Sequence, residues 1–144
     1  MKKSGDYLLN IVCFLLILLW VYAAVSKLIN FGLFRVQMHR QILPMFLKNS
    51  LIYVLPVVEV ATGAFLLFGA TLRTGLYLSA FLLFAFTVYV GMAVFKVFDK
   101  IPCSCGGILA SMGWGAHFIF NIIFLLLTIL GIYQVYRERR LHLL

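Results

Sequence analysis

Apolar residues in this sequence occur in long runs, and short stretches between the runs hold most of the polar and charged positions. The first run, residues 7–26, contains no Asp, Glu, Lys or Arg. A helix of that length is about 30 Å long, which matches the hydrocarbon thickness of a bilayer. The pattern therefore predicts four membrane-spanning helices, at about residues 7–29, 51–72, 75–95 and 113–135.

The connections between the runs predict two further features. Residues 31–50 place apolar side chains on one helical face before Pro44 ends the pattern, so we expect a short interfacial helix between spans one and two. The dipeptide Arg73-Thr74 is expected to form a tight turn between spans two and three. Residues 96–112 form a polar loop before the last span, and this loop contains the most reactive side chains of the chain.

Composition supports a membrane protein and excludes an ordinary soluble domain. Of the 144 residues, 65% are hydrophobic and 11% are charged, whereas about 25% of the residues of a soluble domain are charged. We therefore predict an all-α fold, an integral membrane four-helix bundle in a single domain, residues 1–144. The net charge of +8 does not indicate nucleic-acid binding, because the basic residues flank the apolar runs. The expected partner is the lipid bilayer.

Four spans place both termini on the same side of the membrane. Lys and Arg are divided equally, six on each side, so the positive-inside rule alone does not set the orientation. The basic ends, Lys2-Lys3 and residues 137–140, decide it, because charges at short termini resist translocation. We expect a multi-pass protein of the cytoplasmic (inner) membrane, with both termini in the cytoplasm and the loop of residues 96–112 outside.

The loop of residues 96–112 contains a pair of cysteines, Cys103 and Cys105, separated by one residue. A disulfide between them would close a small ring, and departures from relaxed disulfide geometry store strain that makes the bond easier to reduce. The nearby Lys96 and Lys100 favour the thiolate over the thiol. These features favour a redox-active pair with a relatively oxidising potential.

Two other uses of the cysteine pair stay open. An inert or structural pair is one, although a ring this small stabilises a fold little through chain entropy. A metal site is the other, with Met112 and His117 as candidate further ligands. Because the spacing does not match the usual zinc pattern, the signal for a metal is weak, and we assign no metal ligand.

Two spans carry polar residues that need partners inside the bilayer. Glu59 lies well inside span two, where a lone carboxylate costs about 2.5–3.5 kcal/mol. Lys27, near the outer end of span one, is its best candidate partner, either in a structural ion pair or at a proton site. His117 and Asn121 share one face of span four. The depth of His117 suits a group that handles protons for the thiols, and a satisfied bundle residue is the alternative.

These residues together resemble the MauE branch of the DoxX-like family of redox-associated integral membrane proteins with four helices. The resemblance covers most of the chain, and the combination of the span-two pattern with Cys-x-Cys before the last span is its most specific part. The matching residues are Ala24-Val25-Ser26-Lys27-Leu28 at the end of span one, Pro56-x-x-Glu59-x-x-x-Gly63-x-x-Leu66-Leu67-x-Gly69 in span two, the Cys103-Ser104-Cys105-Gly106-Gly107 loop, and Asn121 in span four.

The resemblance implies a protein that forms or transfers disulfides at the outer face of the membrane, with a thioredoxin-like exported partner, during the maturation of exported proteins. Cys103 and Cys105 would then react, and the depth of His117 makes it the candidate residue for handling their protons. The architecture is also similar to that of quinone-linked disulfide oxidoreductases, an analogy that suggests a quinone as the electron carrier. The alternative is a non-catalytic membrane subunit or anchor of a larger complex. Enzymatic activity, the direction of electron flow, the client and the oligomeric state stay open.

Overall fold

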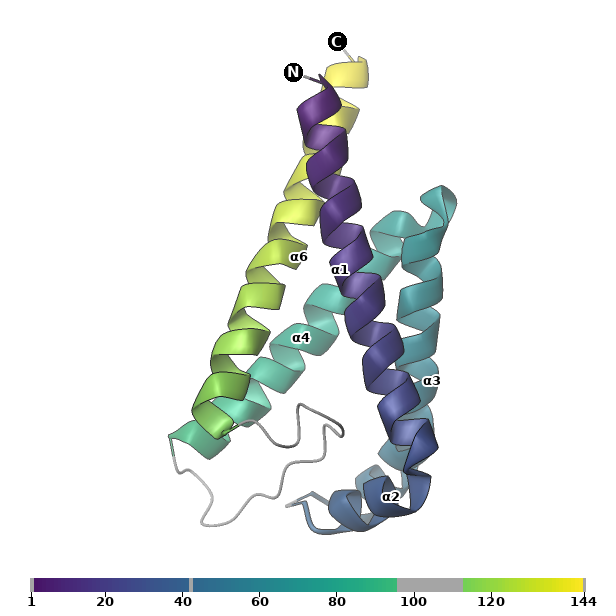
Figure 1. Cartoon of the computed structure of the whole chain (residues 1–144), viewed down its shortest axis with the longest axis vertical. Helices are drawn as coiled ribbons and strands as arrows, with labels where there is room; N and C mark the ends of the chain where they lie inside the picture. Colours follow the sequence, from purple (N-terminus) through teal and green to yellow (C-terminus); the bar gives the residue numbers. More distant parts are fainter. Residues whose placement is uncertain (1, 42, 96–112, 144) are drawn as a thin grey trace.

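The computed structural model describes residues 2–41, 43–95 and 113–143, and it shows a protein built from helices (Figure 1). Within these residues there is no strand, and four helices are long and apolar enough to cross a membrane. The elements in chain order are α1 (Lys2–Ile29), α2 (Phe31–His39), α3 (Met45–Leu67), the 3₁₀ turn η1 (Gly69–Thr71), α4 (Leu72–Val94) and α6 (Trp114–Leu143). The predicted all-α membrane bundle, with a short helix between spans one and two, is confirmed.

Helix α1 has one face toward the bundle and one face toward lipid. Val12, Leu16 and Trp20 follow one another at intervals of one helical turn and are all buried, and they form the centre of the main hydrophobic core. Phe14 and Leu18 lie on other faces and are 61% and 51% exposed. Both faces are apolar, so the contrast between an apolar and a polar face that orients a helix in a soluble protein is absent here. Which face of α1 is buried depends on its packing against the neighbouring helices.

The short helix α2 lies at the end of the bundle opposite both termini (Figure 1). Phe34 and Met38, one turn apart, are buried against Ile52 of α3 in a second, smaller hydrophobic cluster. Pro44 precedes α3 with φ −58°. Proline has no N–H to leave unpaired, so it is well suited to the start of a helix. The chain after α2 is thereby directed into the second span.

The turn between α3 and α4 lies earlier in the chain than predicted. Phe68 is extended, with φ −106° and ψ 130°, and the 3₁₀ turn Gly69–Thr71 follows it. The hydroxyl of Thr71 donates to the carbonyl oxygen of Phe65 at 2.9 Å, which supplies a partner for a carbonyl at the end of α3. The predicted turn at Arg73-Thr74 is wrong, since both residues belong to α4. Arg73 interrupts the apolar run, but the chain has already turned at Phe68 and at Gly69–Thr71.

Helices α1 and α4 each pack against both α3 and α6. Leu66 of α3 and Leu76 and Leu83 of α4 join the buried face of α1 in the main core. Both ends of the chain lie at the same end of the bundle (Figure 1). This is the arrangement that an even number of spans requires.

Residues 96–112 connect α4 to α6, and they lie outside the described residues together with Cys103 and Cys105. The last residue described before this stretch is Phe95, and the first one after it is Gly113. The adjoining ends of α4 and α6 lie at the same end of the bundle as α2 (Figure 1). Residues near that end are therefore the candidates for a functional site.

Candidate functional site

A buried ion pair joins α1 to α3. Lys27 Nζ lies 2.9 Å from Glu59 Oε1, and the two residues are 4% and 0% exposed. The Lys27 ammonium also donates to the carbonyl oxygen of Ala23 at 3.3 Å and lies 5.9 Å from the centroid of the Phe34 ring. The contact predicted from the sequence is therefore present, and further contacts hold Lys27 in place.

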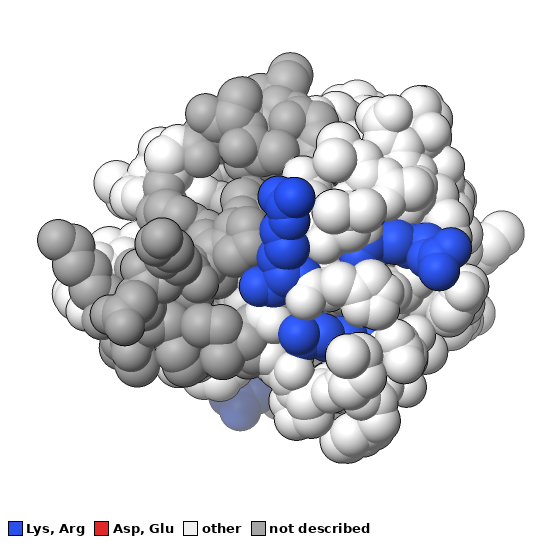
Figure 2. Space-filling model, turned by 90° about the horizontal axis from the view of Figure 1, so that it is seen from below, with Lys and Arg blue, Asp and Glu red and all other residues white. Residues whose placement is uncertain are grey.

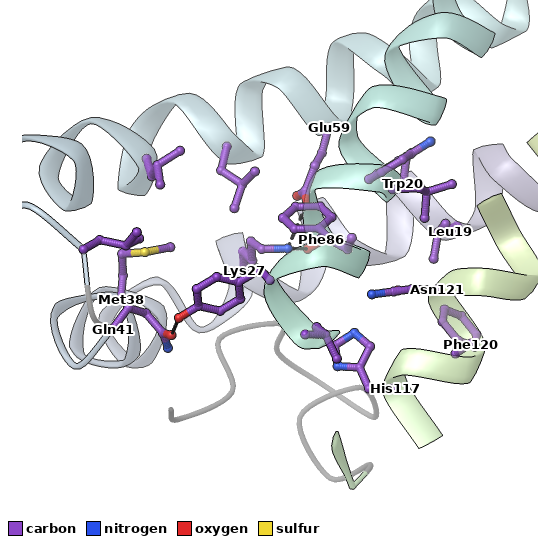
Figure 3. A pocket seen from close by; sticks show the side chains of 17 residues that line it. Leu19, Trp20, Lys27, Met38, Gln41, Glu59, Phe86, His117, Phe120 and Asn121 are labelled. Carbon is purple, nitrogen blue, oxygen red and sulfur yellow. Dashed lines mark hydrogen bonds and ion pairs between the residues drawn. The ribbon is translucent and has the colours of Figure 1, made fainter. Parts of the chain in front are cut away.

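The ion pair lines a cavity of about 140 Å³ between the helices (Figure 3). The four long helices all contribute to its walls, and so do residues of α2 and of the segment after it. Most of the lining is apolar, with Leu55 from α3, Leu83 and Phe86 from α4, and Phe120 from α6. A mainly apolar cavity with a few polar groups is typical of a binding site for a small molecule.

Helix α6 contributes two polar side chains to this cavity, His117 and Asn121. They are 3% and 5% exposed. The backbone N–H of His117 donates to the carbonyl oxygen of Gly113 at 3.0 Å, so the residue lies in the first turns of the helix. The structure thus brings His117 and Asn121 together with Lys27 and Glu59 around one cavity. The two predicted cysteines lie outside the described residues.

Two further polar contacts near the cavity were not predicted from the sequence. The hydroxyl of Tyr89 on α4 donates to Oε1 of Gln41, and both residues line the cavity. Trp20, which also lines it, donates from Nε1 to the hydroxyl oxygen of Ser79 at 2.9 Å. These are neutral groups far apart in the sequence, and no local pattern indicates which of them meet.

A comparison with models of known protein families gives a match over most of the chain. The family described as methylamine utilisation protein MauE matches residues 5–134. The chain belongs to the MauE family. Searches of curated proteins and of solved structures found no match. Membership confirms the resemblance seen in the sequence, and it implies a membrane protein concerned with maturation in methylamine utilisation.

The α3 residues that carry the resemblance to the MauE family lie on one face of the helix. Pro56, Glu59, Gly63 and Leu66 are spaced by three or four residues, and all four are buried. A Cβ atom at Gly63 would lie 3.8 Å from the Cβ of Trp20 on α1. In this MauE-family chain the pattern therefore marks the face of α3 that packs on α1 and places Glu59 beside Lys27.

The cavity of this MauE-family protein combines proton-carrying groups with apolar walls. Lys27 offers hydrogen-bond donors, Glu59 offers acceptors, Asn121 offers both, and the imidazole of His117 is the type of side chain that acts most often as a general acid or base. Within the described part of the chain, no group of three or more His, Cys, Asp or Glu could hold a metal ion. The arrangement is suited to binding a small amphiphile and to proton transfer.

The end of the MauE-family bundle opposite the termini is basic. Figure 2 shows this end, where Lys and Arg are visible on the described surface and Asp and Glu are not. Arg35 and Arg40 are exposed, and Lys48 is half-buried and donates to the carbonyl oxygen of His39 at 3.0 Å. Because Glu59 neutralises Lys27, the ion pair adds no net charge to this end.

Proposed function

We propose that this MauE-family chain is a membrane thiol–disulfide exchange protein. Cys103 and Cys105 react with a thioredoxin-like exported partner at the outer face of the membrane, in the maturation of exported proteins. The observation that carries the proposal is the mainly apolar cavity with its buried polar side chains, because it lies near the end of the bundle where α4 ends and α6 begins. The side chains proposed to hold and transfer protons, His117 foremost, therefore lie near the ends of α4 and α6 that residues 96–112 connect.

The exchange transfers two electrons in two steps. A thiolate of Cys103 or Cys105 attacks one sulfur of the partner's disulfide, a mixed disulfide forms, and the other partner sulfur leaves with the electron pair as a thiolate. The second cysteine attacks the mixed disulfide, which oxidises the Cys103–Cys105 pair and releases the partner with two thiols. The reverse sequence oxidises the partner. His117, buried at the start of α6, is the proposed donor and acceptor of the protons.

A lipid-soluble quinone is the proposed electron carrier. Two thiols and a quinone give a disulfide and a quinol, so that two electrons and two protons pass from sulfur to the ring, and the reverse reaction uses the same atoms. The apolar cavity supports this choice, because it lies within a bundle whose helices are long enough to span the bilayer. A carrier dissolved in the membrane reaches such a site without crossing water.

The ion pair supports the proposed orientation. Lys27 is one of the basic residues on the side of the membrane opposite the termini, and Glu59 neutralises it. Because Lys27 is buried inside the bundle, it is not one of the loop charges that the positive-inside rule counts, which leaves six Lys and Arg on the side of the termini and five on the other. Together with the basic ends of the chain, this small excess favours termini in the cytoplasm. The stretch that contains Cys103 and Cys105 would accordingly face outward.

Equilibrium titration of the purified protein in detergent tests the proposal. The protein is incubated in glutathione buffers of graded potential, and each cysteine is then alkylated and identified by its mass. We expect Cys103 and Cys105 to convert together between dithiol and disulfide, with a midpoint above about −300 mV, the upper limit typical of structural disulfides. A pair that stays reduced throughout, or stays oxidised in strongly reducing buffer, contradicts the proposal and favours a non-catalytic anchor.

The third cysteine of the chain provides a matched control. Cys13 lies in α1 and is partly buried against the main core. Cys13→Ala should leave the titration unchanged, whereas Cys103→Ser or Cys105→Ser should abolish the two-cysteine transition. A transition that survives Cys103→Ser would show that another pair reacts.

Trapping the mixed disulfide identifies the partner protein. A chain with Cys105→Ser cannot complete the second step, so Cys103 should stay bonded to the exported partner until a reductant is added. The expected product is a reducible adduct whose partner contains a thioredoxin-like Cys pair. An adduct that forms equally in the Cys103→Ser, Cys105→Ser double variant would contradict the assignment.

A further inference from the structure

Two buried polar atoms that line the cavity lack a hydrogen-bond partner among the described residues. They are Oε2 of Glu59, whose Oε1 is paired with Lys27, and Nδ2 of Asn121. Glu59 is fully buried, and Asn121 is 5% exposed. An ionised Glu59 oxygen accepts, and the amide nitrogen donates. Because an unpartnered buried polar group destabilises a fold, the two atoms point to a ligand that offers one donor and one acceptor.

The cavity suits a ligand with one six-membered ring. Its volume is about 140 Å³, and an apolar protein cavity of about 150 Å³ holds one benzene molecule. The rings of Phe86 and Phe120 line it, and aromatic side chains pack favourably against another ring. Figure 3 shows Glu59 reaching in from α3 and the amide of Asn121 from α6. The polar groups thus approach the cavity from different helices.

We propose that this cavity binds the ring of a quinone and of its reduced form, the quinol. The amide of Asn121 donates to a ring oxygen in both forms. A ring hydroxyl that donates to Oε2 of Glu59 exists only in the quinol, so the reduced ring satisfies both unpartnered atoms and the oxidised ring satisfies one. The inference rests on the proposed function for the choice of a redox-active ring. The size of the cavity supports a single ring, and the two unpartnered polar atoms support its hydrogen bonds.

Equilibrium binding to the whole protein in detergent tests the site. The probes are a benzoquinone with a ten-carbon tail and its quinol, titrated without oxygen in a calorimeter. We expect saturable binding of both, with the quinol bound more tightly. Decylbenzene, which has the ring and the tail but no oxygens, should bind about tenfold more weakly than the quinone, the effect of one lost hydrogen bond.

Three variants assign the contacts. Asn121→Leu removes the donor at similar size and should weaken both forms about tenfold. In Glu59→Gln the amide oxygen stays with Lys27 and the NH₂ group replaces Oε2, so an acceptor becomes a donor and the preference should shift to the quinone. Thr128→Val is the matched control, because Thr128 is fully buried in α6, donates to the Phe124 carbonyl oxygen at 2.8 Å and does not line the cavity.

A fourth variant keeps the test decisive if the loss of a buried charge unfolds the protein. Ala23 lines the cavity and is small, so Ala23→Leu fills space while leaving the ion pair intact. Saturable binding should be lost, with an unchanged elution volume and helical circular dichroism. No saturable binding to the wild-type protein overturns the inference. The inference also fails if Asn121→Leu and Ala23→Leu both bind quinol as the wild-type protein does.

One variant separates this inference from the proposed function. Cys103→Ser removes disulfide exchange and should leave ring binding unchanged, since the described residues that form the cavity are intact. Ring binding by a protein whose cysteines do not titrate would contradict the proposed exchange and leave the ring site standing. If the cysteines titrate but the protein binds no ring, the ring site is contradicted and the proposed exchange stands.

Discussion

A carboxylate inside a membrane bundle needs a partner, and Glu59 has Lys27. Both side chains lose their water in the ion pair, so their attraction is largely offset by the cost of desolvation. The consequence is asymmetric. Removal of one partner leaves a buried charge without compensation, which costs about 3–5 kcal/mol, whereas removal of both takes away the cost together with the attraction.

We therefore predict that Lys27→Met and Glu59→Gln each lower the unfolding temperature more than the double variant does. Thermal denaturation in detergent, followed by circular dichroism, measures this. Lys48→Met is the control, because Lys48 is half-buried outside the cavity and should change little. Additive losses in the double variant would contradict an interaction between the two residues.

The hydrogen bond from Trp20 to Ser79 gives a second prediction at this scale. Both residues are buried, at 2% and 0% exposed, so Ser79→Ala leaves the indole N–H without a partner. We expect a loss of about 1–3 kcal/mol in the free energy of unfolding. Ser50→Ala removes an exposed hydroxyl bonded to the Phe46 carbonyl oxygen and should cost much less. Equal losses in the two variants would show that the buried hydrogen bond contributes no more to the free energy of unfolding than the exposed one does.

The sequence predicts some of these residue contacts and not others, for a physical reason. A lone charge such as Glu59 in an apolar span requires a partner of opposite charge, and Lys27 is a nearby candidate in the neighbouring span. Gln41 and Tyr89 are neutral, and either could be satisfied in many ways. Their contact depends on where α2 ends relative to α4, which only the folded bundle determines.

Helices α3 and α4 approach each other closely next to their turn. A Cβ atom added at Gly75 would lie 3.0 Å from the backbone nitrogen of Leu66. Such a contact is tighter than ordinary packing, and backbone cannot move aside as a flexible side chain can. The absence of a side chain at Gly75 therefore sets the distance between the two helices.

We predict that Gly75→Ala forces α3 and α4 apart and destabilises the bundle by about 1–3 kcal/mol, the usual cost of overpacking. Gly32→Ala in α2 is the control, because no atom lies within 4 Å of its added Cβ and alanine favours a helix. Thermal unfolding of the two variants in detergent compares them. A Gly75→Ala protein as stable as Gly32→Ala would show that the helices adjust at no cost.

Hydropathy predicts which parts of the chain form helices better than where the helices end. The apolar runs reflect the bilayer thickness, which any span must match. A helix that has formed also extends cheaply into polar residues, so α1 begins at Lys2 and α6 continues to Leu143. The start of α3 at Met45 depends on Pro44 and not on hydropathy.

The molecule as a whole is solvated by lipid along its sides. Large apolar side chains from different helices are widely exposed, among them Tyr53 at 61%, Phe81 at 68% and Ile119 at 59%. In water such a surface would drive aggregation. The architecture was predictable because a bilayer admits few folds, and a helical bundle is one of them. The cavity was not, since its shape depends on how the helices pack.

The proposed orientation predicts which cysteines react in intact cells. In a Cys13→Ala background, a membrane-impermeant maleimide added after reduction should label Cys103 or Cys105 without disruption of the membrane. An added cysteine in a Ser4→Cys variant in which Cys103 and Cys105 are also replaced by Ser, at the end that carries the termini, should be labelled only after permeabilisation. The opposite result for both positions would reverse the topology.

The ion pair also has a consequence for the insertion of the helices into the membrane during synthesis. Lys27 precedes Glu59 by 32 residues, so α1 leaves the ribosome before the carboxylate of α3 is made. Helix α1 enters the bilayer readily, because its apolar run is uncharged and Lys27 lies near the end of the run, where a long side chain can extend to the interface before α3 is present. Helix α3 carries a carboxylate that opposes its partition into lipid. Pairing with Lys27 of a helix α1 that is already in the bilayer offsets part of this cost, so the order of synthesis favours the entry of α3.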